Sequence, residues 1–395
     1  MPNYIHPRLD PNHRFRERRR QAVRRRRRRR LVAATILLAL GAGLGAGATL
    51  MTGKHSAQAT TARSAPIMVD KPTLPRPYPQ EVRGVHVTMA LAGLEGKIDE
   101  YLALKSYGLN TIELDVKDEN GKVGFVSPNL PELARQVGAE QPFYNVESAV
   151  EKIHAAGMYL IGRVVVFEDP TLSAGRPELA ILRPDGSRWL SNGGLGWVNP
   201  YDERVWRYVV GIGAAAAKAG FDEIQFDYVR FPSDGDLSQI VYRHRRAEPK
   251  GTTVARFLRY AGAQLHPLGV RVSADVFGLA ATHDLGIGQV PKRIAPYLDA
   301  LYPMVYPSHY SPGEYGITEP DDYPGRTVAR AVLDFRRQLK GAGMTLIPWL
   351  QDFSLGRPYT IVDVTDEIAA TRRQHTRGFM LWNPEGLYTR EALSG

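Results

Sequence analysis

Short runs of β-branched and aromatic residues alternate with helical stretches from residue 82 to the C-terminus, and this alternation restricts the possible folds most strongly. Eight runs have the length and composition of β-strands: 84–88, 111–117, 159–167, 223–228, 270–277, 300–306, 345–350 and 378–382. Segments with helical periodicity lie between them, at 97–107, 146–156, 203–219, 254–265, 328–339 and 361–374. Strands that alternate with helices form parallel sheets, and eight such units predict a closed (β/α)8 barrel, the α/β fold known as the TIM barrel.

Several of these predicted strands carry charged residues on one face, which is unusual for an open parallel sheet. In 111–117, Glu113, Asp115 and Lys117 alternate with apolar residues, and 223–228 and 270–277 follow the same pattern. Because side chains alternate between the two faces of a strand, each of these strands has one polar and one apolar face. Helices must cover the apolar outer face, so the polar face points into the lumen, whose C-terminal end carries the active site in enzymes of this fold.

Three aspartates on the predicted lumen face lie near the C-terminal ends of their strands: Asp115, Asp227 and Asp275. Asp227 and Asp275 belong to neighbouring strands about 4.8 Å apart. Their carboxyl groups could therefore lie roughly 5–6 Å apart, the separation found in retaining glycosidases. Two carboxyl groups at that distance cannot both ionise easily, which favours one ionised nucleophile and one protonated acid.

Residues suited to binding a sugar follow the same strand ends, because aromatic rings offer flat apolar faces and polar groups can bond to hydroxyls. The candidate substrate-binding residues are His86, Asp115, Lys117, Arg163, Tyr228, Arg230, Tyr306, His309, Trp349, Gln351, Trp382 and Asn383, with Tyr302 and Asp352 beside them. The alternative for the charged members is structural ion pairing inside the barrel, in which Lys117, Arg163 and Arg271 neutralise nearby carboxylates. Trp349 and Trp382 could equally be packing residues.

The first 80 residues have a different composition. Residues 1–30 contain 13 arginines and two acidic residues, and residues 31–51 contain no charged residue. At about 1.5 Å per residue, this second segment could span a hydrocarbon core of about 30 Å as a transmembrane helix. The positive-inside rule then predicts a cytoplasmic tail and an extracytoplasmic barrel anchored in membrane lipid. Residues 52–80, rich in Thr, Ala, Ser and Pro, predict a disordered stalk before a barrel domain at 81–395.

The alternative to an anchor is a signal peptide cleaved after the A-x-A sequence at 57–59, which would release the barrel as a secreted protein. In either case the net charge of +10 belongs to the tail, since 13 − 2 = +11 there and 38 − 39 = −1 elsewhere. A basic groove for nucleic acid in the folded part is therefore excluded. The chain has no cysteine, and no spacing indicates a metal or phosphate site, so neither metal nor organic cofactor is expected. The sequence gives no oligomeric state.

Four segments of the chain resemble a known family: RGVHVT at 83–88, NTIELDVKD at 110–118, EIQFDYVRFP at 223–232 and ALYPMVYPSH at 300–309. The chain resembles an uncharacterised bacterial family of glycoside hydrolase domains, with TIM barrels related to amylase-like and polygalactosaminidase-like barrels. The resemblance covers about residues 82–390, and QFDYVRFP is its most specific part. It implies Asp227 as the nucleophile, because an aspartate ends the fourth strand in the related barrels. Their acid on the fifth strand is commonly Glu, where this chain has Asp275.

The expected protein is thus a membrane-anchored, extracytoplasmic glycoside hydrolase that cleaves an envelope or environmental polysaccharide, with retention of configuration. Asp227 is the expected nucleophile and Asp275 the expected acid/base, while Asp115, Arg230 and His309 position the substrate. A non-catalytic glycan-binding barrel in cell-envelope organisation is the alternative, and it would bind saccharide without turnover. A structural membrane protein with an inert barrel would bind no saccharide.

Overall fold

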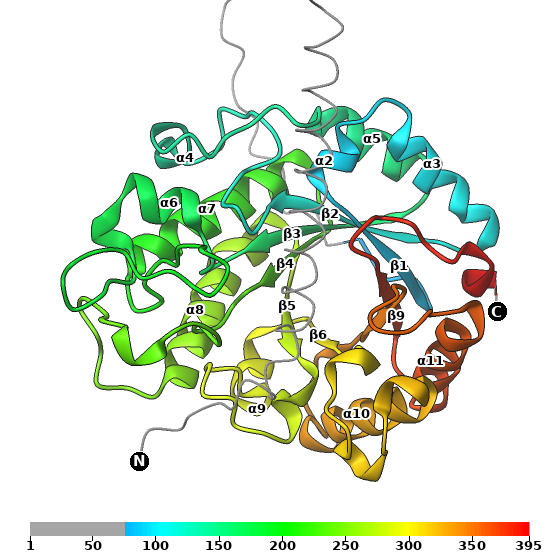
Figure 1. Cartoon of the computed structure of the whole chain (residues 1–395). Coiled ribbons are helices and arrows are strands. Elements are labelled where there is room, and N and C mark those ends of the chain that lie inside the picture. The colour runs from blue at the N-terminus through cyan, green and yellow to red at the C-terminus, as the bar shows by residue number, and fades with distance from the viewer. Residues whose placement is uncertain (1–75, 395) are drawn as a thin grey trace, which may run out of the picture. The chain divides into compact units, whose positions relative to one another are not determined.

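The computed structural model describes residues 76–394 and contains a closed parallel β-barrel surrounded by helices (Figure 1). Its strands are β1 (Val82–Val87), β2 (Thr111–Lys117), β3 (Tyr159–Val165), β4 (Glu223–Asp227), β5 (Arg271–Phe277), β6 (Ala300–Met304), β7 (Thr345–Leu346), β8 (Trp349–Gln351) and β9 (Gly378–Trp382). The strand order β5-β4-β3-β2-β1-β9-β8-β6 closes through a β5–β6 pairing, and all of these pairings are parallel. The predicted (β/α)8 barrel is therefore confirmed.

The predicted strand at 345–350 is divided into β7 and β8, which both pair with β6. The interruption falls at Ile347 and Pro348, and proline has no N–H group with which to continue a ladder. The two short strands thus occupy one position in the barrel. All eight predicted strands are present, with bounds that agree to within two residues.

The six predicted helices are also present and form the outer layer. They are α3 (Lys97–Ala103), which continues as the 3-10 helix η2 (Leu104–Tyr107), α5 (Val146–Ala155), α7 (Glu203–Ala219), α8 (Lys250–Leu265), α10 (Pro324–Gln338) and α11 (Ile361–Arg373). The loops hold shorter helices: α2 (Met89–Ala92), α4 (Glu132–Gln136), α6 (Pro170–Gly175), α9 (Pro291–Ile294), η3 (Pro177–Leu179), η4 (Leu237–Gln239), η5 (His266–Leu268), η6 (Gly278–Ala281), η7 (Ala295–Tyr297), η8 (Pro307–His309), η9 (Glu314–Gly316), η10 (Pro320–Asp322) and η11 (Arg390–Ser394).

Local signals account for the bounds of helix α7, which packs on the barrel. Asp202 caps its first turn by accepting a hydrogen bond from the Arg204 backbone N–H. The helix ends at Gly220, whose φ of 110° is in the left-handed region that favours glycine. Its apolar face, with Val205 and Val209 fully buried, covers the apolar outer face of the strands. The core therefore lies between barrel and helices, and the polar faces of the strands are left to the lumen.

Tyr78, assigned from sequence to the stalk, packs against the N-terminal end of the barrel. Its hydroxyl donates a hydrogen bond to Glu223 Oε2 at 2.6 Å, and the Tyr159 hydroxyl donates to the same oxygen at 3.0 Å. The two tyrosine ring centroids are 5.1 Å apart, and the Arg271 guanidinium lies 4.4 Å from the Tyr78 ring. Since Tyr159, Glu223 and Arg271 each begin a strand, residues 76–80 form part of the barrel base rather than a free stalk.

No helix within residues 76–394 is long and apolar enough to cross a membrane. The predicted tail at 1–30, the predicted span at 31–51 and the predicted stalk as far as residue 75 lie outside the described residues.

Candidate active site

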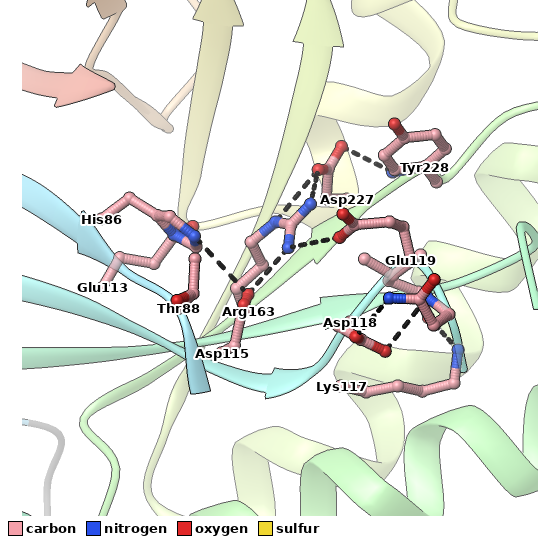
Figure 2. A network of polar contacts seen from close by, with 12 residues as sticks. His86, Thr88, Glu113, Asp115, Lys117, Asp118, Glu119, Arg163, Asp227 and Tyr228 are labelled. Atoms are coloured by element: carbon pink, nitrogen blue, oxygen red, sulfur yellow. Dashed lines mark hydrogen bonds and ion pairs between the residues drawn. The ribbon is translucent and has the colours of Figure 1, made fainter. Parts of the chain in front are cut away.

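Arg163 on β3 is the centre of a polar network at the C-terminal end of the barrel (Figure 2). Its NH1 group donates to Asp115 Oδ1 at 2.7 Å, while its Nε and NH2 groups donate to Asp227 Oδ2 at 3.1 and 2.7 Å. The strand register explains this geometry, since Asp115 pairs with Arg163 on β3 and Val165 of β3 pairs with Asp227. Arg163 therefore joins carboxylates from β2 and β4.

Asp227 accepts hydrogen bonds on both of its carboxylate oxygens. Oδ2 is bound by Arg163, and Oδ1 accepts from the Tyr228 backbone N–H at 2.6 Å. Tyr228 has a φ of 51°, a left-handed conformation that is strained for a bulky residue and that turns its N–H back toward the strand end. Both oxygens of Asp227 are therefore occupied by N–H donors, one of which is a guanidinium.

Asp275 on β5 has a different environment. It is 2% exposed, and its Oδ1 accepts hydrogen bonds from Gln225 Nε2 at 2.5 Å and from Trp349 Nε1 at 2.7 Å. Burial raises the pKa of Asp275 well above its ordinary value, and the charges of Asp227 and Glu113 raise it further. Burial and the neighbouring carboxyl groups therefore favour the protonated form of Asp275, on the strand next to that of Asp227.

His86 and Glu113 extend the network across β1 and β2. His86 Nδ1 lies 2.5 Å from Glu113 Oε2, and its Nε2 lies 3.8 Å from Asp115 Oδ1. Burial lowers the pKa of His86, but the carboxyl groups of Asp115 and Glu113 outweigh this effect and the net shift is upward. Burial raises the pKa of Glu113. Contacts thus run without interruption from Glu113 through His86, Asp115 and Arg163 to Asp227.

Two carboxylates of this network, Glu113 and Glu119, are not among the predicted site residues. Glu113 shares the polar face of β2 with Asp115, so the alternation already placed it in the lumen. Glu119 lies in the following loop, where its Oε2 is 3.8 Å from Arg163 NH1 and its side chain is 21% exposed. Because Glu119 lies in a loop after β2 and not in a strand, no alternation pattern could predict its approach to Arg163.

Two predicted substrate ligands are instead buried in interior contacts. Lys117 has no exposed surface, and its Nζ donates to the Val165 carbonyl at 2.7 Å and lies 3.0 Å from Asp169 Oδ2. Arg230 is 2% exposed, and its guanidinium lies 4.8–5.0 Å from the centroids of three aromatic rings: Trp197, Tyr228 and Phe277. Lys117 thus forms an interior ion pair, the structural alternative considered for it, whereas Arg230 lies among aromatic rings.

Gln351 and Asn383 bind the backbone of the loops around the barrel mouth. Gln351, fully buried, accepts from the Ser308 N–H at 3.1 Å and donates to the Phe353 carbonyl at 3.0 Å. Asn383 donates to the Asp352 carbonyl and accepts from the Glu385 N–H at 2.8 Å. Burial raises the pKa of Asp352 to about 6, and its carboxylate accepts two hydrogen bonds from Thr389.

The predicted aromatic residues divide between the two ends of the lumen. Tyr302 is fully buried and interacts with Glu223 at the base, and its ring centroid lies 6.5 Å from that of Trp349. Tyr306 stacks on Trp382 with centroids 5.6 Å apart at 27°, and the His309 ring meets Tyr306 edge-on at 5.2 Å. Trp382 is half-buried whereas Tyr306 and His309 are buried. Of the predicted aromatic residues, Trp382 and Tyr228 are the half-buried ones.

Within residues 76–394, no group of three or more histidine or acidic side chains is arranged to hold a metal ion. The charged and titratable side chains of the network are its carboxyl groups, His86 and Arg163.

The sequence matches, over residues 84–388, a protein family described as "Putative glycosyl hydrolase domain". A hypothetical protein from Ruminiclostridium thermocellum is 36% identical, with a TM-score of 0.45, over 49% of this chain and 97% of that chain. The glycoside hydrolase domain of PgaB (BpsB) from Bordetella bronchiseptica is 15% identical, with a TM-score of 0.56, over 80% of this chain and 99% of that chain. No curated protein matches the sequence.

A GH20 exo-β-N-acetylglucosaminidase from Vibrio harveyi is 14% identical, with a TM-score of 0.51, over 80% of this chain and 53% of that chain. At such identities the solved glycoside hydrolases establish a common barrel fold. The family match is more specific, because it spans most of the chain and every residue of the network described above. The chain therefore belongs to the glycosyl hydrolase domain family whose model it matches.

Proposed function

We propose that this protein hydrolyses glycosidic bonds of a polysaccharide, with Asp227 as the nucleophile and Asp275 as the acid/base. The observation that carries the proposal is the difference between the two carboxyl groups. Asp227 is bound by the Arg163 cation at 2.7 Å, whereas Asp275 is buried against neutral N–H donors. Nucleophilic attack requires an ionised group and leaving-group departure requires a proton, and these adjacent environments supply one of each.

In the proposed reaction, Asp227 attacks the anomeric carbon while Asp275 transfers its proton to the departing glycosidic oxygen. Water then hydrolyses the glycosyl ester with Asp275 as the base, and the two inversions give net retention. Asp227 loses its charge when the ester forms, but Arg163 remains held by Asp115 at 2.7 Å. Asp115 thus keeps the guanidinium in position through both steps, and Trp382 provides the face for a sugar ring.

The proposed substrate is a polysaccharide of the cell envelope or the environment, reached by a barrel outside the cytoplasm. The support is the composition of the first 51 residues, in which an arginine-rich tail precedes an uncharged segment. We infer a single-pass membrane anchor with the N-terminus in the cytoplasm, or a secreted barrel if the leader is cleaved.

A non-catalytic glycan-binding barrel is the second candidate. It is favoured by the low exposure of Asp275 and by the ion pairs that already engage Asp115 and Asp227. Such a protein would use Trp382 and the loop residues around it to hold a saccharide, with the carboxylates serving only stability.

Reducing-end release from a panel of bacterial and plant polysaccharides separates these functions. The protein should begin near residue 70, so that Tyr78 is retained. We expect release by the wild type and a loss of about 10³-fold or more in Asp227→Asn and in Asp275→Asn, given what a nucleophile and a general acid contribute. Saccharide binding by the wild type and both variants, without release from any polymer, would contradict hydrolysis and favour the binding function.

A further inference from the structure

We infer that Trp349 and Gln225 are positioning residues that determine which oxygen of Asp275 delivers the acid proton. The inference rests on the proposed role of Asp275 and assigns to Trp349 a function other than sugar stacking. The Trp349 indole and the Gln225 amide approach Asp275 from β8 and β4, two strands at different positions around the barrel. All three side chains are almost completely buried, at 3%, 0% and 2% exposure respectively.

Both N–H donors bind the same carboxyl oxygen. Gln225 Nε2 lies 2.5 Å and Trp349 Nε1 lies 2.7 Å from Asp275 Oδ1. An oxygen that accepts two N–H groups has its lone pairs occupied and cannot also direct a proton toward a substrate. The proton of the neutral carboxyl group therefore resides on Oδ2, and Oδ2 is the atom that transfers it to the glycosidic oxygen.

The same two donors favour the transfer itself. When the Oδ2–H bond breaks and the proton passes to the leaving oxygen, Asp275 acquires a negative charge that spreads over both oxygens. The two hydrogen bonds to Oδ1 then become charge-assisted and strengthen. The donors already have this orientation before reaction. They therefore stabilise the transition state, in which Asp275 carries negative charge, more strongly than they stabilise the neutral carboxyl group.

The surrounding structure prevents the carboxyl group from rotating. Gln289 donates to the Asp275 carbonyl at 3.0 Å and accepts from the Phe277 N–H at 2.9 Å, which braces the end of β5. Trp349 is held on both sides by strand pairing, with Met304 of β6 and Met380 of β9. A carboxyl plane turned away from the donors would lose both hydrogen bonds, and a half-turn merely exchanges two equivalent oxygens, so the oxygen opposite the donors always carries the proton.

The test removes each donor and follows Asp275 directly. In protein labelled with ¹³C at aspartate carboxyl groups, the Asp275 resonance is the one that disappears in Asp275→Asn. Trp349→Phe removes the N–H and keeps most of the ring, and Gln225→Leu removes the amide. Since N–H donors favour the ionised form, each variant should raise the pKa of Asp275 above its wild-type value.

Trp206→Phe is the matched control. Trp206 lies on helix α7, and its substitution also removes a buried indole hydrogen bond, which joins Nε1 to the Pro200 carbonyl at 2.8 Å.

Activity supplies a second readout. Each donor variant should lower kcat by about 10- to 100-fold, as expected for one hydrogen bond to a charged group, with KM changed less than kcat. The basic limb of the pH–rate profile should move to higher pH. The ionisable groups that act on Asp275 are Asp227 on β4, Glu113 on β2 and Tyr306 after β6, and all remain intact in the variants.

The two readouts fail in different ways. An unchanged Asp275 titration in both Trp349→Phe and Gln225→Leu would overturn the positioning role, whatever the activity. A shifted titration in a protein that hydrolyses none of the polymers would overturn the proposed function and leave the hydrogen-bonding arrangement standing. If Trp349→Phe fails to fold, Gln225→Leu decides the question alone.

Discussion

The two ends of the barrel lumen contain buried carboxyl groups in contrasting surroundings. Strand β4 contributes to both ends, since Glu223 begins it and Asp227 ends it on the same face. At the base, Glu223 is fully buried and accepts hydrogen bonds from the hydroxyls of Tyr78 and Tyr159. At the mouth, Asp227 is 8% exposed and is bound by the Arg163 guanidinium.

The comparison shows that a shared strand and a shared face do not determine what a carboxyl group can do, because the two ends of the strand have different neighbours. Burial raises the pKa of Glu223, and the tyrosine hydroxyls around it fill the base with neutral donors. Those contacts close the lumen and connect the chain before β1 to the barrel. At the mouth, the Arg163 cation is paired directly with carboxyl groups, and Glu119 among them is partly exposed, which is an arrangement suited to chemistry. Matched substitutions at the two ends should therefore affect different properties.

The largest expected difference is in activity. Asp227→Asn should reduce polysaccharide hydrolysis by about 10³-fold or more, because it removes the proposed nucleophile. Glu223→Gln is the same kind of amide substitution at the other end of β4. It should leave hydrolysis by the folded protein within about threefold of the wild type, as expected for a residue without substrate contact. The initial rate of reducing-end release measures both. A comparable loss in the two variants would remove the distinction between base and mouth.

The next effect is on stability and belongs to the base. Tyr78→Phe removes the hydroxyl that donates to Glu223 at 2.6 Å and should lower the free energy of unfolding by about 1–2 kcal/mol, the range for a buried hydrogen bond. Urea denaturation measures the change. Tyr323→Phe is the control, since Tyr323 is 55% exposed and its substitution should leave stability unaltered. An unaltered midpoint in Tyr78→Phe would show that the segment before β1 contributes no stability.

The smallest effect is a pH-dependent gain in stability at the mouth. Burial and the neighbouring carboxylates raise the pKa of Asp275 in the folded protein, so the folded state retains a proton that the unfolded chain releases above its ordinary pKa of about 3.9. The free energy of unfolding of the wild type therefore decreases as the pH rises above about 3.9 and through the raised pKa of Asp275 in the folded protein. Asp275→Asn cannot titrate, so its Tm should match the wild type near pH 4 and exceed it by roughly 2 °C or more at pH 8. Thermal unfolding across this range checks the sign, and a constant difference would exclude titration as its cause.

Much of the barrel could be predicted because its signals are local. The alternation of Glu113 and Asp115 with apolar residues depends only on the two-residue period of a strand, and both reach partners in the network, His86 and Arg163. The pairing of β2 with β3 shifts register between Asp115 and Lys117, so the period fails at Lys117, which contacts Asp169 instead. The sequence could not predict Glu119 or Tyr78, since each reaches its partner through a segment without periodicity.

The sequence by itself determined that Asp115, Asp227 and Asp275 lie near the C-terminal ends of barrel strands, and hence that these three carboxyl groups are at the barrel mouth. The tertiary structure decided their partners and depth. Trp349 donates to Asp275 across 74 residues of chain, and Tyr78 donates to Glu223 across 145. Lys117 and Arg230 are buried, with Asp169 beside Lys117 and three aromatic rings around Arg230. The physical reason is that strand period is a local property, whereas the pKa and accessibility of a buried group depend on neighbours that only barrel closure brings together.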